Sequence, residues 1–182
     1  MVSGLSLAAR SDIGNRFGVS VPASFERADR IDPGSEVVVL EAGAPGSASV
    51  GRWGFALEDT APARAAVPAE ALEDRSVLTR AFDRNRVLVL ADGVELDGQW
   101  FERTDGSVFA VAGIRHPTAI DGGVAIVTVA GADFDPPHVP VVVPPAQVEI
   151  WLHYSHASEL SAFLTPPDPT TFRVGPRRTR AG

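Results

Sequence analysis

The 182-residue sequence contains neither cysteine nor lysine. Without cysteine the chain has no disulfide, no thiolate metal site and no thiol nucleophile. Because all 16 basic residues are arginine, a lysine that forms a Schiff base with substrate is excluded as well. Two common routes to covalent catalysis are therefore closed before any motif is considered.

The sequence is also short of positive charge and of long hydrophobic runs. Its net charge of −7 disfavours broad, non-specific adhesion to phosphate backbones, although it leaves room for a local groove lined by arginine. No apolar run approaches the roughly 18–20 residues that cross a bilayer. The first 17 residues lack a basic segment followed by a long apolar one, so we expect no secretory signal and no membrane association. The expected location is cytoplasmic.

The segments that are present predict a β-rich fold. Valine-rich or alternating runs near residues 37–41, 86–91, 108–114 and 123–129 are typical of strands. Three turns of the type Ala/Leu/Thr-Asp-Gly within residues 91–106 indicate hairpins. Apolar positions at helical spacing predict one helix over residues 67–85. The expected fold class is α+β: a single domain with a curved, barrel-like, mainly antiparallel sheet and a few short helices.

Prolines surround the apolar run Val141–Val143 within residues 134–152. Proline lacks a backbone donor and disrupts helices and central strands. The pattern therefore predicts a short strand fenced by prolines, and then a helix that begins at Pro144 and Pro145.

The order of several short segments resembles the SRAP (SOS response-associated peptidase) family. The family opens Met-Cys-Gly-Arg-Phe, and Arg16-Phe17 match the last two residues. Trp53-Gly54 match a Trp-Gly pair, and "PARAA" keeps the Ala-Arg-Ala of a family segment at residues 63–65. "AFDRNRVLVLADG", "FAVAGI" and "VPVVVPPAQVEIWL" follow further family segments in the same order. The resemblance implies a domain over residues 14–175, an N-terminal extension over 1–13 and a basic, flexible tail over 176–182.

The resemblance also implies a role in binding single-stranded DNA, but the residues of the family's chemistry are replaced. The family caps abasic sites with an N-terminal cysteine, whose expected counterpart is Gly14. Its catalytic glutamate aligns with Leu96 and its histidine with Pro136. Its asparagine aligns with Pro62. Glu95 lies one position away from Leu96, and a shift of one residue on a strand points to the opposite face. We therefore expect no catalytic residue, no cofactor and no enzymatic activity of the family's kind.

Five residues are the candidates for contact with DNA. Arg16 and Arg64 can contact phosphate, and Phe17 and Trp53 can stack on bases. His138 stands where the family has arginine. Each has an alternative: the arginines can pair with buried carbonyls or carboxylates, the aromatics can belong to the core, and the histidine can lie in a surface loop.

Three hypotheses about function follow. The first is a catalytically silent SRAP-like protein that keeps a groove for single-stranded, abasic or junction DNA. The second is a repurposed scaffold that binds a protein partner and has no role on DNA. The third is an enzyme with a newly built site around His138, Glu95, or the pair His153 and His156, whose spacing can hold a metal on one helical face. A histidine pair without a third ligand is common by chance, and no metal site is expected.

Overall fold

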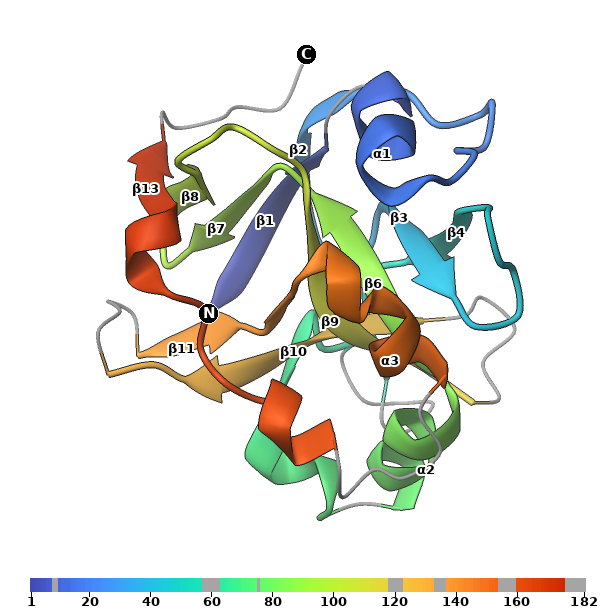
Figure 1. Ribbon diagram of the computed structural model, residues 1–182. Coiled ribbons are helices and arrows are strands. Elements are labelled where there is room, and N and C mark those ends of the chain that lie inside the picture. Colours follow the sequence, from blue (N-terminus) through green and yellow to red (C-terminus); the bar gives the residue numbers. More distant parts are fainter. Residues whose placement is uncertain are drawn as a thin grey trace.

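The computed structural model describes residues 1–7, 10–56, 63–74, 76–117, 123–132, 137–153 and 160–175. Its α-helices are α1 (Arg10–Phe17), α2 (Ser76–Arg84) and α3 (Val148–His153). Four short 3-10 helices accompany them: η1 (Ala69–Leu72), η2 (Pro145–Gln147), η3 (Ser161–Phe163) and η4 (Pro169–Thr171). The three α-helices lie around the periphery of a central β structure (Figure 1).

The strands form two sheets. The five-stranded sheet has the order β13-β8-β7-β1-β2, and its members are β13 (Phe172–Gly175), β8 (Gln99–Arg103), β7 (Gly93–Leu96), β1 (Val2–Leu7) and β2 (Ala28–Ile31). The eight-stranded sheet follows the path β11-β10-β9-β6-β3-β4, formed by β11 (His138–Pro140), β10 (Val124–Ala130), β9 (Phe109–Arg115), β6 (Arg86–Ala91), β3 (Glu36–Glu41) and β4 (Ser49–Arg52). Off this path, β12 (Val142–Val143) pairs with β9, and β5 (Ala66–Pro68) pairs in parallel with β10.

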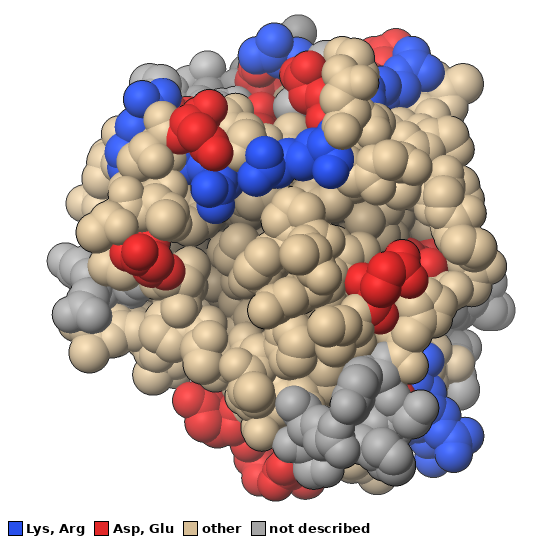
Figure 2. Space-filling view, viewed as in Figure 1, with Lys and Arg blue, Asp and Glu red and all other residues tan. Residues whose placement is uncertain are grey.

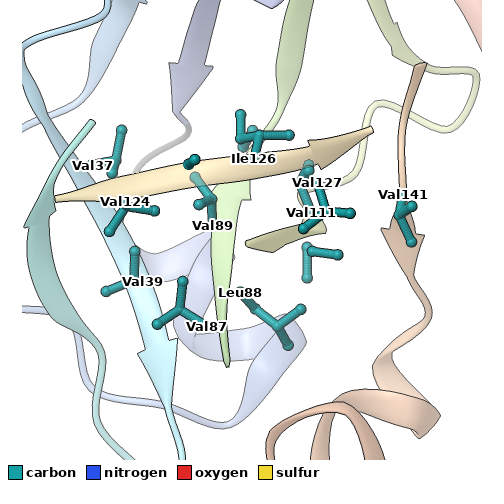
Figure 3. Packing of buried hydrophobic residues seen from close by; sticks show 14 of the residues in the cluster. Val37, Val39, Val87, Leu88, Val89, Val111, Val124, Ile126, Val127 and Val141 are labelled. Atoms are coloured by element: carbon teal, nitrogen blue, oxygen red, sulfur yellow. The ribbon is translucent and has the colours of Figure 1, made fainter. Parts of the chain in front are cut away.

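The main core lies over the eight-stranded sheet. Valine and leucine side chains from β3, β6, β9 and β10 meet there (Figure 3). The central strands β6 and β10 read as nearly continuous buried runs, as expected for strands that are covered on both faces. Branched aliphatic side chains suit such positions because they fill a pleated surface with little loss of rotamer freedom.

The connection from β6 to β7 is a short passage from one sheet to the other. Strand β6 ends at Ala91 and β7 begins at Gly93, so only Asp92 separates them. The backbone N–H of Asp92 donates to Ser6 O at 3.0 Å. A Cβ on Gly93 would lie 2.7 Å from Ser6 Oγ. The absence of a side chain at Gly93 therefore lets the chain turn from one sheet into the other against β1.

The predicted fold class is confirmed: the chain is an α+β single domain with mainly antiparallel sheets. The four predicted strands agree with β3, β6, β9 and β10 to within one residue at most ends. Of the three predicted Asp-Gly hairpins, one is formed: Asp97-Gly98 joins the paired strands β7 and β8, with both residues at positive φ. Gly106 lies between β8 and β9, which belong to different sheets, so this turn is not a hairpin. The first turn, at Asp92-Gly93, is the passage between sheets and not a hairpin.

The segment expected as an N-terminal extension over residues 1–13 contains β1 and the start of α1. Strand β1 lies inside the five-stranded sheet, paired with β2 on one side and β7 on the other. Leu5 and Leu7 are almost completely buried. Residues 10–17, of which 16 and 17 were expected in an extended segment, form α1. The tail over residues 176–182 lies outside the described residues.

The predicted helix over residues 67–85 is divided. Residues 66–68 pair with β10 as β5, residues 69–72 form η1, and α2 begins only at Ser76.

Arg86, directly after α2, is 6% exposed. Its guanidinium donates to Phe82 O at 2.5 Å and to Trp151 O at 2.7 Å, and burial lowers its pKa. Arg86 therefore satisfies carbonyl groups at the ends of α2 and α3, as a basic residue near a helix C-terminus can.

The proline-bounded segment behaves as predicted, with one addition. Val141 is fully buried; its N–H donates to Val127 O at 3.0 Å, and its C=O accepts from Ala112 N at 2.8 Å. It therefore connects β11, which pairs with β10, to β12, which pairs with β9. Pro144 and Pro145 then begin η2, which leads directly into α3.

Within the described ranges, no helix is both long and apolar enough to cross a membrane.

Candidate functional site: a cavity lined by arginine beside α1

A cavity lies between α1 and the connection from β8 to β9. Its volume is about 490 Å³. Polar and charged side chains provide most of its lining: Asp12, Asn15, Arg16, Arg27, Asp92 and Ser107. Asp12, Asn15 and Arg16 are spaced i, i+3 and i+4 on α1, so they lie on one face of the helix.

Arg16 is half-buried in the wall of this cavity. Its Nε–H is buried and has no hydrogen-bond acceptor within the part of the chain that the structure describes. A buried donor without an acceptor costs about 1–3 kcal/mol, and more when the group is charged. Such groups are rare in folded proteins and point to a missing partner.

The second arginine of the cavity, Arg27, is largely exposed. Its Nε lies 3.3 Å from Asp29 Oδ1, in an ion pair whose two side chains are more than half exposed. Solvent screens such a pair strongly, so its contribution to the free energy is small. Arg27 can therefore leave Asp29 and bind another anion with little loss of free energy. Figure 2 shows basic side chains across the upper part of the molecule, with acidic side chains interspersed among them.

The cavity is also bounded by two polar groups with fixed positions. Asp92 accepts a hydrogen bond from Ser6 Oγ at 2.5 Å. Ser107 donates to Asp105 through both its backbone N–H, at 3.0 Å, and its hydroxyl, at 2.6 Å. These bonds to Ser107, and one from Arg103, lower the pKa of Asp105. These hydrogen bonds therefore hold Asp92 and the loop that contains Ser107 in fixed positions.

Phe17, the other candidate on α1, points away from this cavity. It is partly buried, packs against the core and lines a smaller cavity of about 180 Å³ with residues of α3. Its side chain contributes to the packing of α1 and not to the arginine-lined wall.

Trp53 is not available for stacking on a base. Its side chain is completely buried, and its Nε1–H donates to Ala65 O at 2.8 Å. The backbone of Trp53 forms an isolated bridge to Val124. The alternative stated for this residue, an aromatic of the core, is therefore the correct one, and the expectation of a DNA contact is wrong.

Arg64 and His138 are exposed but lie elsewhere. Arg64 forms two backbone hydrogen bonds of 2.9 Å with Phe55, just before β5. His138 begins the edge strand β11, opposite Ala130. Neither residue lines the cavity that contains Arg16. The structure therefore keeps Arg16 as a candidate in a defined cavity, while Arg64 and His138 are surface residues without such surroundings.

The metal hypothesis receives no support within the described ranges, where no group of three histidine, cysteine or acidic side chains could hold an ion. His153 lies 3.2 Å from Glu149 in an i,i+4 pair on α3. His156, like Pro136 and Pro62, lies outside the described residues.

Glu95 belongs to a buried polar cluster that the sequence did not reveal. Its carboxylate accepts from Arg30 Nη2 at 2.8 Å and from Ser3 Oγ at 2.9 Å. The Arg30 guanidinium also donates to Asp32 at 2.7 Å and lies 5.8 Å from the centre of the Trp100 ring. The hydrogen bond to Glu95 is the main cause that raises the pKa of Arg30. Glu95 therefore holds β1, β2 and β7 together, which is a structural role.

Leu96 points to the opposite face from Glu95, as its neighbouring position on a strand requires. It lies directly across from Val2 in the ladder between β1 and β7. The space beside it is about 20 Å³ and is lined entirely by apolar side chains, among them Val139, Pro140 and Pro167. This face carries no acid, base or nucleophile among the lining residues.

Of the five predicted site residues, Arg16 lines the cavity beside α1 and the other four do not. The cavity's other members were missed because they come from four separate segments of the chain. The spacing of Asp12, Asn15 and Arg16 at i, i+3 and i+4 is the signal in the sequence that indicates one face of a helix.

Comparison with known proteins supports the fold alone. No known family's sequence profile and no curated protein matches the chain. Among solved structures, a protein from Bordetella bronchiseptica aligns with a TM-score of 0.79 and 17% identity over 98% of this chain and 100% of its own. A protein from Bacteroides thetaiotaomicron aligns with a TM-score of 0.76 and 14% identity over 94% of this chain and 90% of its own. A phage-related protein from Bordetella bronchiseptica has a TM-score of 0.76 and 18% identity over 97% of this chain and 94% of its own.

Proposed function

We propose that this chain is a cytoplasmic, SRAP-like protein that binds single-stranded DNA reversibly, without covalent capping of abasic sites. The observation that carries the proposal is the cavity beside α1, which is lined by both Arg16 and Arg27. Phosphate oxygens are strong acceptors for guanidinium groups. Two arginines in the wall of one cavity are the arrangement expected of a surface that contacts phosphate.

The surroundings of Leu96 support the absence of catalysis. The family has its catalytic glutamate at this position, and here an apolar side chain faces other apolar side chains. General acid–base chemistry needs an ionisable group within hydrogen-bond reach of the reacting atoms. The chain also has no cysteine, so the family's thiol chemistry has no nucleophile.

The pairing of β1 with β7 favours a different counterpart for the family's opening segment. In the family, the reactive cysteine and the glutamate act on the same aldehyde, so their positions must be close. Val2 lies opposite Leu96, whereas Gly14 lies on α1. Strand β1, and not residues 14–17, therefore fits the family's opening segment better. This change of register also removes the expected extension over residues 1–13.

The proposal is tested by fluorescence anisotropy with a labelled single-stranded oligonucleotide over a series of salt concentrations. We expect weak binding that decreases with salt, because phosphate contacts release counterions. Arg16→Ala should weaken binding and reduce the salt slope by about 1, as expected when one phosphate contact is lost. Arg80→Ala, which removes an exposed arginine of α2, is the matched control and should leave the slope unchanged.

Equal binding by the two variants would show that Arg16 has no contact with DNA. Absence of any salt-dependent binding by the unmodified protein would overturn the proposed function and favour the alternative, a scaffold that binds a protein partner.

A further inference from the structure

Asp-Gly pairs are chemically reactive, and the described residues contain Asp92-Gly93, Asp97-Gly98 and Asp105-Gly106. Because glycine has no side chain, its backbone nitrogen can reach the carboxyl carbon of the preceding aspartate and close a succinimide ring. Water reopens the ring to aspartate or to isoaspartate, in which the main chain runs through the side-chain carbons. A further pair, Asp121-Gly122, lies outside the described residues. The surroundings of each pair decide whether the ring can form.

The first pair is held by the core. The Asp92 carboxylate accepts from Ser6 Oγ at 2.5 Å, and the Asp92 N–H donates to Ser6 O at 3.0 Å. Gly93 is buried, and a Cβ there would lie 2.7 Å from Ser6 Oγ. The Gly93 nitrogen cannot turn toward the carboxyl carbon without displacing Ser6, which is completely buried.

The carboxylate of Asp105 is exposed but held by hydrogen bonds. It accepts from the backbone N–H of Ser107 at 3.0 Å, from the Ser107 hydroxyl at 2.6 Å and from Arg103 Nη2 at 3.3 Å. Hydrogen bonds from Ser107 and from Arg103 lower the pKa of Asp105, so the carboxylate stays ionised. An ionised carboxylate is a poor electrophile, because its negative charge repels the electron pair of the attacking nitrogen.

Asp97-Gly98 has neither kind of protection. Both residues are exposed at the tip of the turn between β7 and β8. The Asp97 carboxylate pairs with the terminal ammonium of Met1, and the two groups are 57% and 89% exposed. Solvent screens such a pair, so it holds the carboxylate weakly. A Cβ on Gly98 would meet no atom within 4 Å, so the turn can rearrange without a clash.

We infer that Asp97-Gly98 is a site of spontaneous modification, at which isoaspartate forms faster than at Asp92 or Asp105. The Gly98 nitrogen bonds to Cγ of Asp97, and one carboxyl oxygen leaves as water with the proton of the amide. Water then adds to the main-chain carbonyl carbon of Asp97, whose bond to the Gly98 nitrogen breaks. The bond from Cγ to that nitrogen remains, so the step consumes no reagent other than the water it released.

The product changes the turn and the end of β1. Leu96 and Gln99 are paired across a two-residue turn, and isoaspartate adds one atom to the main chain of this turn. The Asp97 N–H also donates to Met1 O at 3.2 Å. A longer turn moves this donor, so the modification loosens the end of β1. The inference does not depend on the binding of DNA.

Peptide mapping of the protein after prolonged warming in mildly acidic buffer tests the inference. Trypsin cleaves after Arg86, Arg103 and Arg115, so Asp92 and Asp97 fall in one peptide and Asp105 in the next. Electron-transfer fragmentation then distinguishes isoaspartate from aspartate at each position. We expect isoaspartate to accumulate several-fold faster at residue 97 than at the other two positions.

Protein unfolded in urea is the matched control, since its three pairs have lost their different surroundings and should react at similar rates. In the folded protein, Ser107→Ala removes the hydroxyl bond to Asp105 and should raise the rate there, while Asp97→Ser should remove the main product. Isoaspartate that forms at Asp92 or Asp105 as fast as at Asp97 in the folded protein would overturn the inference. So would an Asp97 that reacts only after unfolding.

Discussion

Arg30 and Glu95 illustrate how single residues of this chain acquire roles that their sequence context does not indicate. Glu95 is adjacent to the position of the family's glutamate, yet its carboxylate is 7% exposed and paired with Arg30. Trp53 stands in a motif associated with the family and is a core residue. In both cases the direction of the side chain, and not the residue type, decides between a structural and a binding role.

The Arg30–Glu95 pair should contribute measurably to stability. Arg30→Met leaves the Glu95 carboxylate buried without its guanidinium partner, and we expect the free energy of unfolding to fall by about 2–3 kcal/mol. The expected value is below that of a fully buried pair because the Arg30 side chain is 21% exposed. Chemical denaturation measures the difference.

Two further variants separate the ion pair from loss of packing. Arg30→Met combined with Glu95→Gln should be more stable than Arg30→Met alone, since the uncompensated charge is gone. Arg27→Met, in the exposed pair with Asp29, should change stability by less than about 0.5 kcal/mol. If the double variant is no more stable than the single one, the charge of Glu95 is not what Arg30 stabilises.

At the scale of elements, strands were predictable where their hydrophobic pattern is strong and local. Strands β3, β6, β9 and β10 have valine-rich runs, which burial on both faces requires. Strand β1 was missed because its sequence, VSGLSL, includes serine and glycine. Gly4 is nevertheless required by its surroundings, since a Cβ there would lie 3.1 Å from Glu95 Oε2. A glycine whose place depends on a residue far away in the sequence produces no periodic pattern among its neighbours in the sequence.

The cavity could not be predicted for a related reason. Its lining comes from α1, from Arg27, from Asp92 and from the loop after β8. These segments are brought together only by the pairing of β1 with β7 and by the turn between the sheets. Sequence periodicity identifies the faces of single elements but carries no information about which elements share a cavity.

The passage from β6 to β7 gives a prediction at this scale. Gly93→Ala would bring a Cβ to 2.7 Å from Ser6 Oγ and 3.4 Å from the Trp100 ring. We expect the free energy of unfolding to fall by about 1–3 kcal/mol, as for other overpacked sites. Thermal unfolding followed by circular dichroism measures the loss.

Gly43→Ala is the matched control, because no atom lies within 4 Å of the position its Cβ would take, and it should be close to neutral. Ser6→Ala in the Gly93→Ala background removes the nearest atom and should restore part of the lost stability. If Gly93→Ala is as stable as the unmodified protein, the passage between the sheets has more room than its geometry indicates.

At the scale of the whole molecule, the account combines an acidic protein with a local basic surface. The net charge is −7, yet basic side chains lie across the upper part of the molecule, interspersed with acidic ones (Figure 2). Long-range attraction to DNA should therefore be weak, and affinity should depend on few contacts.

The central claim is reversible binding of single-stranded DNA without capping, and an abasic oligonucleotide tests it most directly. The protein is incubated with the labelled oligonucleotide, and equal portions are run on a native gel and on a denaturing gel. We expect a shifted band on the native gel that disappears on the denaturing gel, because the chain has no thiol to close a ring with the aldehyde and Leu96 lies in an apolar space. A shifted band that survives denaturation without reductant, or no shift on either gel, would contradict the account.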